Sequence, residues 1–338
     1  MPLIETRGLT KVFRQPVKDP GLVGSLKHLA TRNFKDRVAV NDVDLTIEAG
    51  EAIAYVGPNG AGKSTTIKML TGILVPTSGE IRVAGLVPHK RRIDNARNIG
   101  VVFGQRTQLW WDIPVRESLA LLKEIYRVPR DRYEQTLRDF DELLDLDEIM
   151  GQIGRRLSLG QRMRGDLAAS LLHDPKILYL DEPTIGLDIE VKDRVRAFIR
   201  KIVAERGTTV MLTTHDLDDI EDICKRIVII DEGRVIYDGE LQAVTDTYAR
   251  ERTITFVVRG APPLAAVAAR LEGCRVEAGE SPDQIVVSFD RFETNAGDVV
   301  GAVLATAELV DFHIDEPAIE DVIRKVYAGR LDLRGAAA

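Results

Sequence analysis

Short apolar runs alternate with longer amphipathic segments along the chain up to about residue 245. The apolar runs have the length of strands and cover residues 45–47, 52–56, 81–83, 99–103, 177–180, 209–212 and 227–230. The segments of helical length cover residues 64–70, 116–126, 132–144, 159–173 and 191–204. This alternation predicts an α/β domain around a largely parallel sheet, which we place at residues 1–245.

A stretch with two prolines and two glycines, residues 14–33, interrupts this alternation near the amino terminus. Leu22, Val23, Leu26 and Leu29 share one face of a short helix within it. The helix either packs on its own domain or meets a membrane surface or a partner protein. The pattern favours the first reading and leaves the second open.

After about residue 250 the order of elements changes. Strands are expected at 253–259, 274–277, 285–289 and 310–314, and helices at 264–271, 298–307 and 318–327. This order predicts a small α+β domain of the ferredoxin-like kind at residues 250–338, with one extra helix and a short tail. None of its residues has a pattern that indicates catalysis.

Composition and charge argue against several classes of protein, namely nucleic-acid binders, membrane-spanning chains and secreted chains. The chain has 338 residues, 46 lysines and arginines against 53 aspartates and glutamates, and a net charge of −7. This acidic balance argues against a nucleic-acid binder. No run reaches the 18 apolar residues of a membrane span, and no secretory signal is expected. Cys224 and Cys274 lie too far apart for a zinc knuckle and suggest no disulfide framework, so we expect a reducing compartment.

A phosphate-binding loop follows the apolar run 52–56. The segment Gly57-Pro58-Asn59-Gly60-Ala61-Gly62-Lys63-Ser64 matches G-x-x-x-x-G-K-[ST] at every fixed position and opens a helix. Its glycines let backbone N–H groups turn toward phosphates, while Lys63 reaches the β and γ phosphates and Ser64 binds Mg²⁺. We therefore expect this loop, with Thr65 beside it, to bind Mg·ATP.

Two adjacent carboxylates, Asp181 and Glu182, end the apolar run 177–180. Successive residues of a strand point to opposite faces, so the two carboxylates are expected to have different roles. We expect Asp181 to hold Mg²⁺ and Glu182 to act as the general base on water. An acidic pair after a strand is usually a solvated turn, and the phosphate loop is what favours catalysis here.

Six motifs in a fixed order carry a resemblance to a known family. Besides the phosphate loop and the carboxylate pair they are Gln105, Leu157-Ser158-Leu159-Gly160-Gln161, Gly186-Leu187-Asp188 and His215. In these motifs, across residues 3–240, the chain resembles the ATPase subunit of an ABC transporter. Its departure from the family's L-S-G-G-Q signature is Leu159. The resemblance implies a P-loop NTPase core with a helical subdomain at about 105–165.

The resemblance also implies a head-to-tail dimer that sandwiches two ATP molecules. Ser158 and Gly160, with Gln161 completing the signature, would contact the γ-phosphate held by the other subunit, and Asp188 would cross the interface. Gln105 would sense Mg²⁺ and the attacking water, and His215 would hydrogen-bond the γ-phosphate. A second copy of the chain is the favoured partner in the dimer, and a paralogue is the alternative.

Two aromatic sites complete the expectations from the family. Phe34, 29 residues before Lys63, is favoured over Phe13 as the platform on which adenine stacks. Trp110 and Trp111 follow Gln105 where these ATPases usually receive a helix of the membrane subunit. The pair either receives that helix or fills the core of the helical subdomain, and the sequence does not separate the two.

We interpret the chain as the ATP-binding and ATP-hydrolysing subunit of an ABC exporter that drives a separately encoded ABC-2-type permease. The insertion and the carboxy-terminal domain are similar to those of exporters of drugs, viologen-type compounds and polysaccharides. The expected place is the cytoplasmic face of the membrane, reached through the permease. The alternatives are a soluble ABC ATPase acting on ribosomes or nucleic acid, and an ATP-dependent regulatory module with little turnover.

Overall fold

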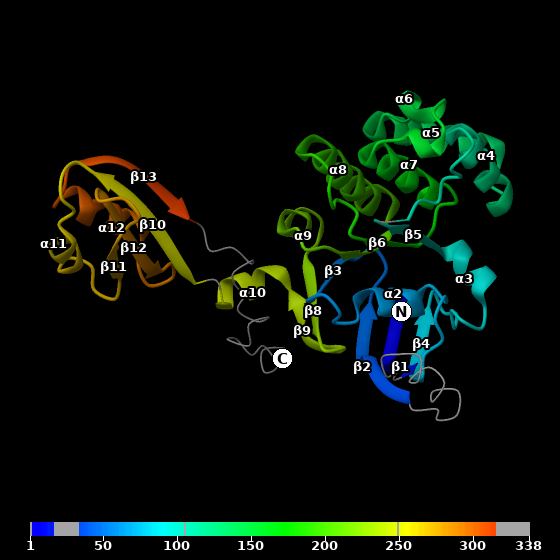
Figure 1. The fold of residues 1–338 in the computed structure, drawn as a ribbon, viewed down its shortest axis with the longest axis horizontal. Coiled ribbons are helices and arrows are strands. Elements are labelled where there is room, and N and C mark those ends of the chain that lie inside the picture. Colours follow the sequence, from blue (N-terminus) through cyan, green and yellow to red (C-terminus); the bar gives the residue numbers. More distant parts are fainter. Residues whose placement is uncertain (1, 17–33, 105, 249, 316–338) are drawn as a thin grey trace, which may run out of the picture. The chain divides into compact units, whose positions relative to one another are not determined.

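The computed structural model describes residues 2–16, 34–104, 106–248 and 250–315. These residues form two compact units, one up to Gly239 and one from Glu240 (Figure 1). The expected helix around residues 22–29, the expected helix 318–327 and Gln105 lie outside the described residues. No helix in the described ranges is long and apolar enough to cross a membrane.

The first unit contains a six-stranded sheet in the order β5-β6-β7-β3-β8-β9. The strands are β3 (Ala52–Val56), β5 (Ile99–Phe103), β6 (Ile177–Asp181), β7 (Thr209–Thr213), β8 (Arg226–Asp231) and β9 (Arg234–Glu240). The pairs from β5 to β8 are parallel. Their nearly continuous apolar sequences are buried, as expected for strands covered on both faces. The expected α/β domain with its largely parallel sheet is confirmed.

A second sheet of the same unit is antiparallel and has the order β2-β1-β4. Its strands are β1 (Ile4–Pro16), β2 (Phe34–Ile47) and β4 (Ser78–Val83). Side chains from both sheets and from helix α2 (Lys63–Leu70) form one apolar core, with Ile4, Tyr55 and Ile67 fully buried in it. The phosphate loop therefore begins on one sheet and ends against the other.

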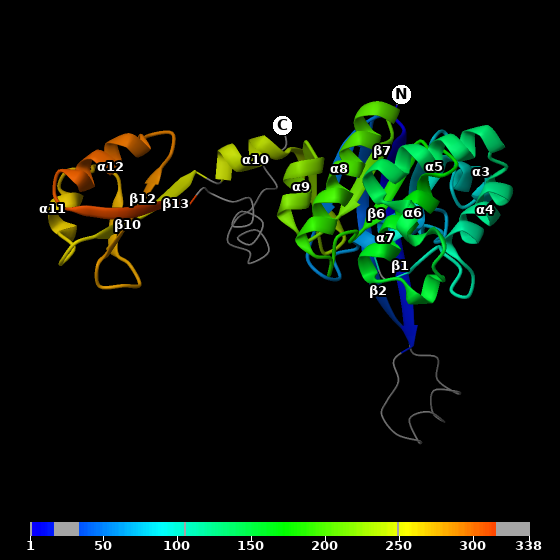
Figure 2. The same cartoon turned by 90° about the horizontal axis from the view of Figure 1, so that it is seen from above.

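The described residues of this unit form seven further α-helices. They are α3 (Arg92–Asn98), α4 (Val115–Tyr126), α5 (Arg130–Leu144), α6 (Leu146–Met150), α7 (Leu159–Leu171), α8 (Ile189–Arg206) and α9 (Leu217–Ile223). Helices α4 to α7 gather in one group, and α8 and α9 lie side by side (Figures 1 and 2). The periodicity missed α3, α6 and α9, because five to seven residues complete at most two helical turns.

The second unit begins with α10 (Leu241–Tyr248) and has an antiparallel sheet in the order β11-β12-β10-β13. Its elements follow as β10 (Glu251–Val258), α11 (Leu264–Ala268), β11 (Arg275–Ala278), β12 (Gln284–Asp290), α12 (Ala296–Leu304) and β13 (Leu309–Asp315). From Ile254 onward every second residue of β10 is buried, and Ile254, Phe256 and Val258 meet Val267 and Val299 of the two helices. The antiparallel sheet of the expected second domain is therefore present.

The two cysteines should differ sharply in reactivity. Cys224 is 3% exposed and burial raises the pKa of its thiol, whereas Cys274 is partly exposed. Because the thiolate is the reacting form, a maleimide at pH 7.5 should label one cysteine per chain quickly and both only after denaturation. Peptide mapping of the labelled chain checks which cysteine reacted. Fast labelling of Cys224 in the native chain would contradict the packing around α9 and β8.

Candidate nucleotide-binding site

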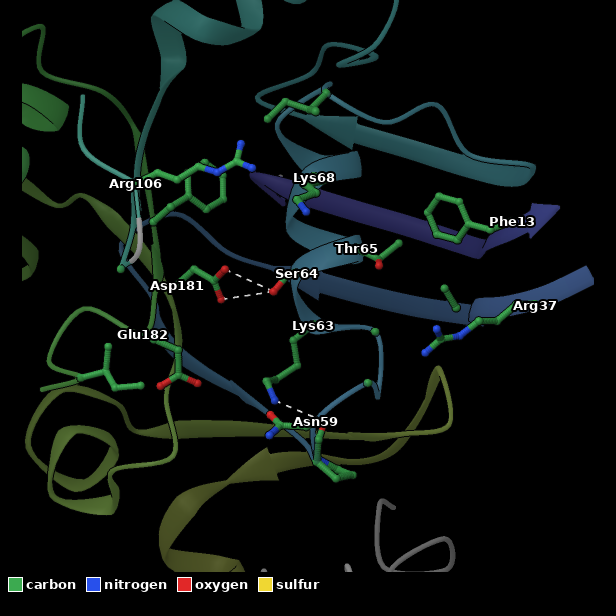
Figure 3. A pocket seen from close by; sticks show the side chains of 18 residues that line it. Phe13, Arg37, Asn59, Lys63, Ser64, Thr65, Lys68, Arg106, Asp181 and Glu182 are labelled. Carbon is green, nitrogen blue, oxygen red and sulfur yellow. Dashed lines mark hydrogen bonds between the residues drawn. The ribbon is translucent and has the colours of Figure 1, made fainter. Parts of the chain in front are cut away.

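A pocket of about 730 Å³ lies at the amino terminus of α2 (Figure 3). It brings together the phosphate loop, the end of β6 and the hairpin of β1 and β2. Its lining includes Pro58, Asn59, Gly60, Gly62, Lys63, Ser64, Thr65, Asp181 and Glu182, all expected from the sequence, and also Arg37, Lys68 and Arg106. The last three cations have no motif around them, and only the fold shows that they share the pocket.

The conformation of the phosphate loop depends on two glycines. Gly62, which precedes the first residue of α2, has φ of 111°, and a Cβ there would lie 2.4 Å from the carbonyl oxygen of Ala39. A Cβ on Gly57 would lie 2.2 Å from the carbonyl oxygen of Ile230. Only glycine fits such close approaches, so β2 and β8 hold the loop from both sides.

Lys63 lies at the base of the loop and is 8% exposed. Its ammonium donates to the carbonyl oxygen of Gly57 and lies 3.4 Å from that of Pro58. Burial lowers the pKa of Lys63, while the nearby carboxylates of Glu182 and Asp181 act in the opposite direction. The loop thus places a cation in the pocket beside the amino terminus of α2, which is an arrangement suited to polyphosphate.

Asp181 is held by hydroxyl groups from two elements. Ser64 Oγ donates to Asp181 Oδ2 over 3.2 Å, and Thr213 Oγ1 donates to Oδ1 over 2.6 Å. Among the described residues, no group of three or more histidine, cysteine, aspartate or glutamate side chains forms a metal site. One hydroxyl and one carboxylate still fit Mg²⁺, which binds few protein oxygens and takes its other ligands from phosphates and water.

Glu182 follows in a left-handed conformation with φ of 56°, which is strained for a non-glycine residue and common at functional sites. His215 Nε2 lies 3.4 Å from Glu182 Oε1. Burial raises the pKa of Glu182, and burial together with Lys63 lowers the pKa of His215. A carboxylate with a raised pKa is a stronger base, so the pair is suited to accepting a proton from water.

A buried carboxylate that the sequence did not single out connects this pair to its surroundings. Asp219 is fully buried in α9 and accepts hydrogen bonds from the hydroxyl groups of Thr184 and Thr214 and, over 2.7 Å, from Arg196 Nε. Thr184 follows the carboxylate pair, Thr214 precedes the histidine, and Arg196 lies on α8. In the sequence, Asp219 looks like one of several solvated acids in a first helical turn.

The aromatic platform expected at Phe34 is not supported by the position of that residue. In the antiparallel register, Phe34 lies opposite Pro16 and is 51% exposed, whereas Phe13 lies opposite Arg37. Phe13 and Arg37 both line the pocket, and Phe34 does not. Counting residues back from Lys63 does not capture this difference, because β1 and β2 continue beyond the pocket and Phe34 lies opposite Pro16 at the end of their pairing.

The signature residues lie away from the pocket of their own chain. Ser158 caps the amino terminus of α7, where Ser158 and Gln161 exchange side-chain to backbone hydrogen bonds of 3.2 and 3.0 Å. Asp188 caps α8, where its carboxylate accepts one hydrogen bond, from Val191 N over 3.0 Å. A Cβ on Gly160 would contact Val191. Ser158, Gly160, Gln161 and Asp188 therefore share one region, and none of them lines the pocket.

Two further expectations concern the segment after β5. Gln105 is not described, but its neighbours Gly104 and Arg106 line the pocket. Trp110 is 40% exposed and Trp111 57% exposed, so neither indole is enclosed in the core of the helical group. The guanidinium of Arg162 lies 5.6 Å from the ring centre of Trp111. The tryptophans thus offer an aromatic surface close to the pocket-lining segment.

Comparisons with known proteins identify the family of this chain. The family model described as ABC transporter matches residues 40–185. The ABC transporter ATP-binding protein NatA of Bacillus subtilis is 33% identical over 66% of this chain and 91% of its own length. The daunorubicin resistance ATP-binding protein DrrA3 of Streptomyces coeruleorubidus is 32% identical over 87% of this chain and 92% of its own length.

Solved structures give the same result for the fold. CbiO1 from Clostridium perfringens, part of an ABC transporter complex, is 26% identical and superposes with a TM-score of 0.58, covering 73% of this chain and 91% of that one. A dimeric bacterial ABC transporter cassette is 25% identical, with a TM-score of 0.58, 70% of this chain and 98% of that one. This chain belongs to the ATP-binding subunits of ABC transporters, which hydrolyse ATP to drive transport.

Proposed function

We propose that this ATPase subunit energises an exporter through a separately encoded ABC-2-type permease. The observation that carries the proposal is the length of the match to DrrA3, 295 residues, which continues past the first unit into the second. A Nod factor export protein of Rhizobium meliloti is 35% identical over 217 residues, and a methionine import protein of Enterococcus faecalis is 33% identical over 219. The ATPase core alone therefore does not separate export from import, and the longer match favours export.

The proposed working form is a dimer with two shared sites. Ser158, Gly160, Gln161 and Asp188 lie outside the pocket of their own chain, and in the proposed dimer a partner subunit would bring a second set to it. Residues at the amino terminus of α7 present a hydroxyl and backbone N–H groups, which suit a γ-phosphate. Leu159 is 38% exposed beside Gly186 and would border the same interface. A homodimer is the favoured form.

In the proposed reaction, the phosphate loop and Lys63 bind the triphosphate of ATP. Ser64 and Asp181, together with Gln105, would hold Mg²⁺, which supplies charge neutralisation when it is bound. Glu182 takes a proton from the attacking water, and His215 hydrogen-bonds the γ-phosphate beside it. Positioning and charge supply most of the catalysis in such phosphoryl transfers, so the fixed loop is as important as the base.

Adenine recognition is assigned to Phe13 in this proposal. Phe13 lies on the wall of the pocket formed by β1, and Arg37 lies opposite it on β2 (Figure 3). Stacking of a purine on an aromatic ring contributes affinity without chemistry. The guanidinium of Arg37 adds a cation close to where the ribose and α-phosphate would lie.

The proposed contact with the permease is the surface of Trp110 and Trp111. Exposed aromatic side chains with an arginine beside them are typical of protein interfaces. This contact would hold the ATPase at the cytoplasmic face of the membrane. It also places the permease next to the loop that carries Gln105 and Arg106.

The second unit is proposed to be an accessory domain of the ferredoxin-like kind. Its elements run βαββαβ from β10 to β13, and its strand order, β13-β10-β12-β11, supports that assignment. We keep residues 1–245 and 250–338 as the proposed limits of the two domains.

Purification from mild detergent tests the proposed partner. A tagged chain expressed from its own genome should bring a polytopic membrane protein with it, identified by mass spectrometry. Trp111→Ala, with Phe292→Ala in the second unit as the matched exposed aromatic, should reduce that yield selectively. Recovery of ribosomes or nucleic acid in place of a membrane protein would contradict the proposal and favour the soluble alternative.

A further inference from the structure

Asp166 is a buried acid on α7, the helix that starts at the signature, and it takes no part in the proposed ATP chemistry. It lies in the middle of α7 and is 3% exposed. An aspartate that is buried this deeply is kept only where hydrogen-bond donors compensate for the loss of water. The hydrogen-bond donors to Asp166 therefore indicate which part of the chain it positions.

Those partners belong to the loop that leaves β5. Thr107 Oγ1 donates to Asp166 Oδ1 over 2.8 Å, and Gln108 N donates to the same oxygen over 2.7 Å. Thr107 Oγ1 in turn accepts from Leu109 N over 3.0 Å. Burial raises the pKa of Asp166 to about 6, and these donors act against the shift. One carboxylate oxygen thus organises three consecutive loop residues.

Gly165, the residue before Asp166, also contacts this loop. Leu109 is 3% exposed, and a Cβ on Gly165 would lie 2.7 Å from Leu109 Cδ1. The absence of a side chain at Gly165 lets the leucine pack closely on α7. We call Gly165 and Asp166 with Thr107, Gln108 and Leu109 the loop socket.

The socket stands between three functional parts of the chain. On one side the loop continues to Arg106, which lines the nucleotide pocket, and on the other to Trp110 and Trp111. The helix that carries the socket starts at the signature, where Ser158 is the N-cap. The contact between Asp166 and the loop 106–111 therefore links three parts of the chain. They are Arg106 in the nucleotide pocket, the two exposed tryptophans, and helix α7 with the signature at its start.

We propose that Asp166 is a positioning residue that fastens the loop 106–111 to the signature helix, so that both move together when the pocket binds ATP. The inference rests on the proposed function, because it assigns a route between the nucleotide and the permease surface. Asp166 itself touches no substrate. It acts by keeping the loop in the position in which Arg106 lines the pocket.

The two tryptophans make this loop directly observable. Trp110 and Trp111 are the only tryptophans of the 338 residues, so intrinsic emission reports this segment alone. In the full chain, Mg·ATP should change that emission. Asp166→Ala should lose the change and lower kcat about tenfold, with KM and ATP binding within about threefold of the parent, since misplacement by about 1 Å is costly.

Two variants separate positioning from general stability. Asp166→Asn keeps an acceptor for Thr107 and Gln108, and we expect it to retain the emission change and kcat within about threefold. Thr107→Val combined with Asp166→Ala should cost no more than Asp166→Ala alone, because both remove the same contact. Asp131→Ala, at the exposed start of α5, is the matched control and should behave as the parent.

Each contrary result has a definite meaning. An Asp166→Ala chain with unchanged emission response and kcat overturns the inference, as does a folded Asp166→Asn chain that fails like the alanine variant. A parent that hydrolyses ATP without any change in emission overturns it too, but leaves the proposed function intact. A parent without hydrolysis at high protein concentration would contradict the proposed function itself and the inference with it.

Discussion

Replacing Glu182 with glutamine should lower ATP hydrolysis about 100-fold or more while ATP binding stays close to that of the parent. Glutamine has nearly the same shape but cannot accept the proton of the attacking water. Asp181, Ser64 and the phosphate loop remain in place, so Mg·ATP should still bind. If hydrolysis reopens the proposed dimer, the variant should accumulate as a closed, ATP-bound dimer.

Phosphate release and size-exclusion chromatography with Mg·ATP measure the two effects. Glu124→Gln, on the exposed face of α4, is the matched control and should leave both unchanged. Hydrolysis by Glu182→Gln at the parental rate would remove Glu182 from the role of base. Loss of ATP binding in the variant would instead assign the carboxylate to nucleotide affinity.

Two inactive variants should restore activity when they are mixed. Lys63→Ala damages the phosphate loop, and Ser158→Glu places a negative charge where the signature would meet the partner's γ-phosphate. A negative side chain is tolerated at a helix amino terminus, so the second variant should fold. In a mixed dimer, one site then combines the intact loop of one subunit with the intact signature of the other.

The rate of ATP hydrolysis expected for the mixture follows from the number of intact sites in it. In an equal mixture, about half of the dimers are mixed and each has one intact site, so about a quarter of the parental rate per chain is expected. Lys63→Ala mixed with Glu182→Gln is the control, because both changes damage the same half of a site and no intact combination forms. Activity of Ser158→Glu alone at the parental level, independent of protein concentration, would contradict shared sites.

Most helices and strands of the first unit could be predicted because their signals are local. The run Ala52–Val56 has no polar residue, and the eight residues from Gly57 to Ser64 are fixed by the needs of a phosphate loop. The strand, the turn and the start of the helix can therefore be predicted from about fifteen consecutive residues. The helices α3, α6 and α9 could not be predicted in this way, because each has too few turns to show a helical period in its apolar residues.

The choice between Phe13 and Phe34 required the tertiary structure. Both aromatics lie on strands next to the phosphate loop, and spacing along the chain favoured Phe34. The register of β1 against β2 places Phe13 on the pocket and Phe34 beyond it. Register depends on pairing between residues that are distant in sequence, which spacing along one strand does not contain.

The motifs alone predict the chemistry proposed for this protein: the phosphate loop, the carboxylate pair, the signature and His215. The fold decides how these parts are held, since Asp219 and Asp166 look like ordinary surface acids in the sequence, yet both are buried. It also separated the signature from the pocket of its own chain and exposed Trp110 and Trp111. Burial and proximity arise from packing between distant segments, whereas a motif needs only its own residues.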